Sequence, residues 1–291
     1  MSDIHLPNAT ANDIPQCVAR ALEEDIGNGD ITAQLIAADK QATAIVISRE
    51  TATICGRPWV DEVFKQLDRN IQVVWHVKEG ESVAPDTTLL SLTGNARMLL
   101  TGERTALNFL QTLSATASLA RQYADRVKDT EVRILDTRKT IPGLRLAQKY
   151  AVTVGGCHNH RIGLYDAFLI KENHIAACGG IAQAVAQARQ IAADKLVEVE
   201  VENLEELQQA LDAKADVVML DNFSPAEIDQ LASIDLGRTK IEVSGNITDD
   251  SVKHYLSSSV SYISSGSLTK HIQAIDSVSY THLTLPTTER V

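Results

Sequence analysis

The 291-residue sequence predicts an α/β protein whose second part is an incomplete, about six-stranded α/β barrel. Over about the first 115 residues, strand-like and helix-like stretches mix without regular alternation. From Val132 onward, short β-branched runs alternate with helical patterns, as in a parallel sheet with crossover helices. About six such strands fall short of the eight of a regular barrel, and a doubly wound sheet is the alternative.

The first region begins with a helix over residues 13–24, which the turn-forming residues 25–30 end. Apolar and β-branched residues then predict strands at residues 43–48, 71–77 and 89–92. An amphipathic helix is expected over residues 59–67. A longer helix, rich in alanine and leucine, is expected over residues 102–127 and joins the two regions.

The second region repeats one unit, a short strand followed by a helix. Strands are expected at residues 132–136, 167–171, 196–201, 216–220, 240–243 and 262–264. Helices are expected at residues 144–152, 181–192, 204–211, 225–231, 249–256 and 268–274.

The composition, 44% hydrophobic and 22% charged, is that of a soluble globular protein. No apolar run approaches the ~20 residues of a membrane helix, and the N-terminus lacks the pattern of a secretory signal. The four cysteines show no paired spacing, which fits a reducing cytoplasm. The run from Cys157 to His160 has no second ligand pair at usable spacing, so we do not expect a zinc site there.

The segment from Arg133 to His174 is a basic island in an acidic chain. It holds seven Lys and Arg against three Asp and Glu, whereas the whole chain has a net charge of −11. This distribution argues against a nucleic-acid-binding or membrane-binding surface and favours a focused site for small anions. A solvated basic helix face is the alternative, but apolar runs lie directly beside the charges.

Polar residues follow each predicted strand of the second region. In chain order they are Asp136, Arg138 and Lys139; Lys171; Glu200; Asp221; Ser244, Gly245 and Asn246; and Ser264, Ser265, Gly266 and Ser267. The carboxyl ends of parallel strands face one common mouth, where active sites form. Any single residue, such as Asp221, could be a helix cap, but a series of six strand ends favours a site.

The chemistry of these residues divides into three kinds. Small residues after the last two strands let backbone N–H groups approach a phosphate. Glu200 and Asp221 suit Mg²⁺, ribose hydroxyls or a cationic sugar transition state, although an ion pair with Lys171 is an alternative. The donors that carboxylates prefer are supplied by Arg138, Lys139, His160 and Arg161. The combination indicates a carboxylated substrate that meets a phosphorylated sugar.

At these residues the sequence resembles the quinolinate phosphoribosyltransferase family. The resemblance rests on motifs in the family's order: Glu24-Asp25 with Gly29-Asp30-Ile31-Thr32, Gly102-Glu103-Arg104-Thr105-Ala106-Leu107-Asn108, Asp136-Thr137-Arg138-Lys139-Thr140, Pro142-Gly143-Leu144-Arg145, Asn159-His160-Arg161 with Gly163-Leu164, Ile170-Lys171-Glu172-Asn173-His174, Glu198-Val199-Glu200, Leu220-Asp221-Asn222 and Ser244-Gly245. They span about residues 20–275.

This resemblance implies an open α/β sandwich over residues 1–115, a barrel over residues 116–274, and a tail, residues 275–291, that returns to the sandwich. It implies a cytoplasmic homodimer without nucleic-acid or membrane partners. It also implies that quinolinate and phosphoribosyl pyrophosphate react, with Mg²⁺, to nicotinate mononucleotide, pyrophosphate and CO₂ in de novo NAD biosynthesis.

Site roles follow from the same resemblance. The residues that would bind quinolinate are Arg104, donated across the dimer, with Thr137, Arg138, Lys139, His160 and Arg161. Lys171, Glu200 and Asp221 would be catalytic: Lys171 would bridge base and sugar, and the two acids would serve the ribose and hold Mg²⁺. The 5′-phosphate would lie on the loops of Ser244, Gly245 and Asn246 and of Ser264, Ser265, Gly266 and Ser267.

Residues 277–291 depart from the family pattern, so we expect the last strand of the sandwich to be imperfect. Two other functions remain open. A paralogue could use another aromatic acid, because the second carboxylate contact is what selects a dicarboxylate. A sensor that binds without turnover would have lost Lys171, Glu200 or Asp221, and the sequence retains all three.

Overall fold

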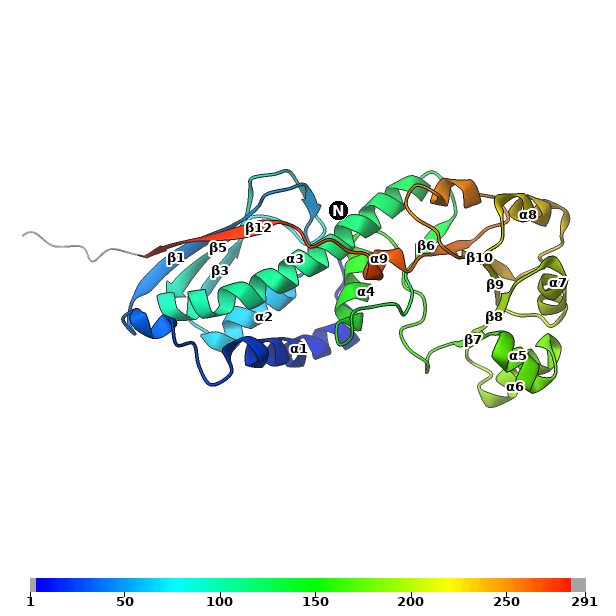
Figure 1. The fold of residues 1–291 in the computed structure, drawn as a ribbon, viewed down its shortest axis with the longest axis horizontal. Coiled ribbons are helices and arrows are strands. Elements are labelled where there is room, and N and C mark those ends of the chain that lie inside the picture. The colour runs from blue at the N-terminus through cyan, green and yellow to red at the C-terminus, as the bar shows by residue number, and fades with distance from the viewer. Residues whose placement is uncertain (1–3, 284–291) are drawn as a thin grey trace, which may run out of the picture. The chain divides into compact units, whose positions relative to one another are not determined.

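The computed structural model describes residues 4–283, which form two compact units (Figure 1). Unit 1 consists of Met1–Leu119, Pro142–Gly155 and Ile272–Val291, and unit 2 of Ala120–Ile141 and Gly156–His271. Neither unit is one continuous stretch of chain. Within residues 4–283 no helix has the length and apolar content needed to cross a membrane.

Unit 1 is a four-stranded antiparallel sheet with helices. Its elements are α1 (Asn8–Ile26), η1 (Ala33–Leu35), β1 (Gln41–Ser48), β2 (Ala52–Thr53), α2 (Arg57–Leu67), β3 (Gln72–Trp75), β4 (Ser82–Val83), β5 (Thr87–Asn95), the greater part of α3 (Ala96–Val127), α4 (Arg145–Val154) and β12 (Ser277–Leu283). The sheet order is β12-β1-β5-β3, and β2 pairs separately with β4. The predicted helices and strands of this region are all present, with shifted ends.

The core of unit 1 follows from alternation along β1 and from the apolar face of α2. Ala42, Ala44 and Val46 are buried while the residues between them are more exposed, as expected for a strand with one face on the core. Trp59 of α2 is fully buried, and its ring centroid lies 5.7 Å from that of Tyr150 in α4. This contact is one reason why α4 belongs to unit 1, although the sequence places it in the barrel region.

The tail contradicts the expectation of an imperfect last strand over the residues that are described. From Ser277 to Leu283, β12 pairs antiparallel with β1 over seven residues without a register shift. Val278, Tyr280 and Thr281 are β-forming residues, and an edge strand needs backbone pairing more than a particular side-chain sequence. Residues 284–291 lie outside the described part of the chain.

Unit 2 contains a parallel sheet of six strands in the order β6-β11-β10-β9-β8-β7, which confirms the predicted α/β class and strand number. The strands are β6 (Arg133–Leu135), β7 (Phe168–Ile170), β8 (Val197–Val201), β9 (Val217–Asp221), β10 (Lys240–Ser244) and β11 (Tyr262–Ser264). The helical segments are α5 (Glu172–Cys178), α6 (Ile181–Ile191), α7 (Leu204–Asp212), α8 (Pro225–Gln230), η2 (Leu231–Ser233), η3 (Val252–Tyr255) and α9 (Ser267–Lys270). β6 and β7 are its two edges.

Two helical predictions for unit 2 need correction, and one helix was missed. α5 was not predicted because its sequence shows no apolar periodicity, and in the structure none of its residues is buried. The helix expected at residues 249–256 is only the 3₁₀ turn η3. The helix expected at residues 268–274 stops at Lys270 as α9, because the chain from Ile272 onward belongs to unit 1.

Candidate active site

The loops after β6 and β11 are in contact because these two strands are neighbours. The backbone N–H of Lys139 donates to Thr137 Oγ1 (3.1 Å), and Thr269 Oγ1 donates to the carbonyl of Lys139 (2.9 Å). A Cβ on Gly266 would lie 2.8 Å from Lys139 Cδ. A side chain at position 266 would therefore displace the side chain of Lys139, so the predicted cation loop and the predicted phosphate loop lie close together.

The ends of β9 and β10 form a second pair of neighbouring loops. Asp221 is in register with Ser244, and Asn222 Nδ2 donates to Asp221 Oδ2 (3.0 Å). Gly245 has φ of +146°, and a Cβ there would lie 3.0 Å from Asn222 Oδ1. Asn246 is exposed beside them. The predicted acid and the predicted Ser-Gly turn thus lie side by side.

Lys171 and Glu200 meet at the ends of β7 and β8. Lys171 Nζ forms an ion pair with Glu200 Oε2, which is the alternative that the sequence left open for this acid. The side chain of Lys171 is 41% exposed and that of Glu200 is 14% exposed. The lysine can therefore leave the carboxylate for an anionic ligand without a large change in its solvation.

Arg138 and Arg161 lie close enough for their positive charges to interact. Burial, and then the charge of Arg138, lower the pKa of Arg161 below its usual range. Arg161 Nη1 donates to the carbonyl of Ala167 (3.3 Å), while its Nε is buried and has no hydrogen-bond partner among residues 4–283. Two neighbouring guanidinium groups of this kind favour an anion between them.

Two of the serines in the predicted phosphate loop have buried side chains. Ser264 and Ser265 are 2% and 1% exposed. Ser265 Oγ donates to the carbonyl of Ile247 (2.8 Å), so it joins the loops after β10 and β11. The more exposed part of this predicted phosphate loop is Gly266 and Ser267.

An irregular stretch, His158–Arg161, connects the two edges of the unit 2 sheet, and we refer to it as the crossing segment. At one end, His158 N–H donates to the carbonyl of Ile134 in β6 (2.8 Å). At the other, Arg161 bonds to Ala167, directly before β7. The carboxylate of Asp136, which is fully buried, accepts from Asn159 Nδ2 (2.6 Å) and from the backbone N–H of His160 (2.9 Å).

The ring of His160 lies against two buried acids whose roles the sequence did not reveal. His160 Nε2 is 2.8 Å from Glu198 Oε2 and 3.5 Å from Glu242 Oε2. Burial raises the pKa of both carboxyl groups, and the charge of Glu198 raises that of Glu242 further. An acid inside an otherwise apolar strand, as Glu242 is in β10, is the signal that could have identified the pair.

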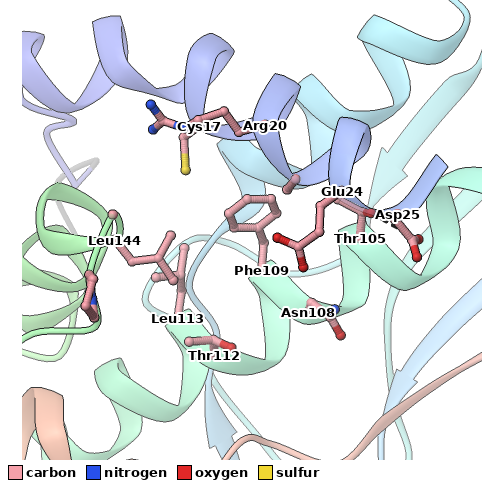
Figure 2. Close-up of a pocket in the computed structure, with 13 residues that line it drawn as sticks. Cys17, Arg20, Glu24, Asp25, Thr105, Asn108, Phe109, Thr112, Leu113 and Leu144 are labelled. Carbon is pink, nitrogen blue, oxygen red and sulfur yellow. Dashed lines mark hydrogen bonds between the residues drawn. The ribbon is translucent and has the colours of Figure 1, made fainter. Parts of the chain in front are cut away.

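Unit 1 has a pocket of about 420 Å³ where three of the quoted motifs meet, between α1, α3 and Pro142–Leu144 (Figure 2). Glu24, Asp25, Thr105 and Asn108 line it, and Figure 2 shows these side chains between the two helices. Arg104 is exposed on α3, next to Thr105. Its helix carries no other residue of the predicted site.

Comparison with known proteins gives consistent matches along the chain. Residues 30–114 match the family model of the N-terminal domain of quinolinate phosphoribosyl transferase, and residues 116–278 match that of its C-terminal domain. A probable carboxylating nicotinate-nucleotide pyrophosphorylase of Bacillus subtilis (strain 168) is 41% identical over 254 residues, covering 87% of this chain and 88% of the relative. A mitochondrial decarboxylating quinolinate phosphoribosyltransferase 2b of Nicotiana tabacum is 36% identical, covering 94% and 84%.

Solved structures agree with the sequence relatives. The nicotinate-nucleotide pyrophosphorylase from Francisella tularensis has a TM-score of 0.91 and 48% identity, covering 97% of this chain and 100% of that one. NadC from Streptococcus pyogenes has a TM-score of 0.90 and 37% identity, covering 94% and 98%.

Proposed function

Because this chain belongs to the quinolinate phosphoribosyltransferase family, we propose that it transfers the phosphoribosyl group of phosphoribosyl pyrophosphate to quinolinate. The products are nicotinate mononucleotide, pyrophosphate and CO₂, in de novo NAD biosynthesis. The main support within the structure is the row of cations, acids and Ser-Gly turns at neighbouring strand ends of unit 2. The reaction needs all three kinds of group.

Quinolinate carries two carboxylates, and the two guanidinium groups of Arg138 and Arg161, whose charges interact, suit it. Lys139 adds a third cation from the same loop as Arg138, and Thr137 fixes that loop through its bond to the Lys139 N–H. Arg104 would complete the set from the partner subunit. Planar guanidinium groups bind carboxylates in two-point contacts, which also orients the pyridine ring.

Lys171, Glu200 and Asp221 would act on the sugar. As the bond between ribose C1 and pyrophosphate breaks, positive charge grows on the ring, and nearby carboxylates stabilise that charge more in the transition state than in the ground state. Lys171 would turn from Glu200 towards the anionic substrates. The ring nitrogen of quinolinate would then attack C1.

Mg²⁺ would be held by Asp221 and Glu200 together with oxygens of the pyrophosphate. The donor set fits this ion, since both are carboxylates, the oxygen ligands that Mg²⁺ prefers, at ends of neighbouring strands. When bound, it would neutralise charge on the leaving pyrophosphate. The 5′-phosphate would lie on the backbone of Ser244, Gly245 and Asn246 and on Gly266 and Ser267.

We further propose a homodimer in the cytoplasm. An isologous dimer would give two equivalent sites, each with Arg104 from one subunit and the unit 2 cations from the other. The direct test of the function is to incubate the protein with quinolinate, phosphoribosyl pyrophosphate and Mg²⁺. CO₂ and pyrophosphate should form in equal amounts. Binding of both substrates without products would favour a sensor, and turnover of a different aromatic acid alone would favour a paralogue.

Glu200→Gln should lower kcat by a much larger factor than it raises KM for phosphoribosyl pyrophosphate. The amide keeps the size of the side chain but loses the charge that would stabilise the cationic ribose, so the loss should be on the order of a hundredfold, about 3 kcal/mol of transition-state stabilisation. Steady-state kinetics with both substrates varied would measure it. An unchanged kcat with a raised KM would mean that Glu200 binds only ground-state sugar.

A further inference from the structure

The crossing segment carries Arg161 but has almost no sheet pairing of its own. Apart from the single bridge between His158 and Leu135, it is held by side chains. Asp136 accepts from Asn159 and from the His160 backbone, and Glu198 contacts the His160 ring. The position of a proposed substrate cation therefore depends on buried carboxylates rather than on a strand.

The hydrogen bonds of His160 define its tautomer. The backbone N–H of Arg161 donates to His160 Nδ1 at 2.8 Å. An amide N–H can only donate, so Nδ1 must be an unprotonated acceptor and the ring proton must be on Nε2. Nε2–H then donates to Glu198 Oε2 at 2.8 Å. Both ring nitrogens are occupied inside the unit, and neither is left to hold a substrate carboxylate.

We propose that Glu198, supported by Glu242, is a positioning residue for quinolinate: it accepts from Nε2–H and so holds the ring of His160, and His160 in turn holds the Arg161 backbone in place. Glu198 would act through His160 without touching substrate. This rests on the proposed function only in taking quinolinate as the ligand of Arg161. His160, predicted to bind a carboxylate itself, becomes the link between a buried acid and the arginine that binds it.

His160, Glu198 and Glu242 could also bind a metal ion. The hydrogen bonds of His160 distinguish a metal site from the positioning role proposed above. Ligand atoms of His160, Glu198 and Glu242 lie within 4.8 Å of one another. They also line a cavity of about 340 Å³, so a cation added in solution can reach them. A metal on Nε2 would require that nitrogen to be unprotonated, which would put the ring proton on Nδ1, facing the Arg161 N–H.

Two variants test the proposal. Glu198→Ala removes the acceptor and should raise KM for quinolinate about tenfold or more, with KM for phosphoribosyl pyrophosphate changed less than about twofold. Glu198→Gln keeps an oxygen that can accept from Nε2–H and should restore most of the quinolinate affinity. In ¹⁵N-labelled wild-type protein, NMR should show His160 protonated on Nε2 and not on Nδ1, with the signal assigned from His160→Gln. In Glu198→Ala the Arg161 N–H still faces Nδ1, so the Nε2–H tautomer should remain, but the Nε2–H proton should exchange faster with solvent because no carboxylate holds it.

Glu79→Ala is the control, because Glu79 is a half-buried acid of unit 1 that accepts from the backbone N–H groups of Gly56 and Arg57. It should lower Tm without a selective change in KM for quinolinate. An Nδ1–H tautomer in the wild type, stoichiometric Zn²⁺ binding that Glu198→Ala abolishes, or equal changes in both KM values would each overturn the proposal. The NMR result is independent of turnover, so a failed activity assay would refute the function and not the tautomer.

Discussion

Arg104→Ala and Lys171→Ala should each be nearly inactive, and an equal, re-associated mixture of the two should regain about a quarter of the wild-type activity per site. Under the proposed arrangement each site takes Arg104 from one subunit and Lys171 from the other. Half of the randomly formed dimers are hybrids. One site of each hybrid is then intact and the other lacks both cations, which gives the quarter.

The control for this experiment is Arg126→Ala. Arg126 lies on the same helix as Arg104, but it is half-exposed and pairs with Asp249 at 2.7 Å. It should keep near-normal activity and show no gain on mixing. Subunit exchange can be followed by native mass spectrometry of subunits with different isotope labels. Confirmed exchange without recovery would mean that Arg104 and Lys171 serve the same chain's site.

Nicotinate should be a far poorer substrate than quinolinate. Leaving a buried cation without its partner costs roughly 2–5 kcal/mol, and each 1.4 kcal/mol is tenfold in kcat/KM, so the expected loss is about thirtyfold to several thousandfold. Burial and the charge of Arg138 already lower the pKa of Arg161, so a single carboxylate would leave part of this positive charge uncompensated.

The measurement is kcat/KM for each acid at saturating phosphoribosyl pyrophosphate, with pyrophosphate release as the common readout. Arg138→Gln should reduce the difference in kcat/KM between quinolinate and nicotinate, because it removes a positive charge that only the dicarboxylate fully neutralises. Equal kcat/KM values in the wild type would contradict a dicarboxylate pocket and favour the paralogue.

The parallel strands were predictable because each is a short β-branched run between turn residues, and such runs pair in few other ways. The site residues at the strand ends could be predicted for the same reason, because the carboxyl ends of parallel strands lie at one edge of the sheet. The predictions that failed were those that depend on tertiary contacts. α4 joins unit 1 through contacts such as that of Tyr150 with Trp59, which no local pattern encodes.

The candidate site shows the same limit. Glu198 lies within one of the quoted motifs. The alternation of apolar and acidic residues in its strand could not show that it contacts a histidine 38 positions earlier in the chain. His160 was predicted as a ligand of a substrate carboxylate, and its contacts with the Arg161 N–H and with Glu198 were not predictable from the sequence. Ser264 and Ser265 were predicted to line a phosphate loop because they are small, and small residues also fit buried positions.

The pairing of β12 with β1 has a consequence for synthesis of the protein. β1 is made early, yet its outer edge is covered only by residues 277–283. During translation that edge keeps unpaired N–H and C=O groups until residues 277–283 have left the ribosome. Nascent chains should therefore depend on chaperones more than the finished protein does, and any truncation before Ser277 should cause aggregation through β1.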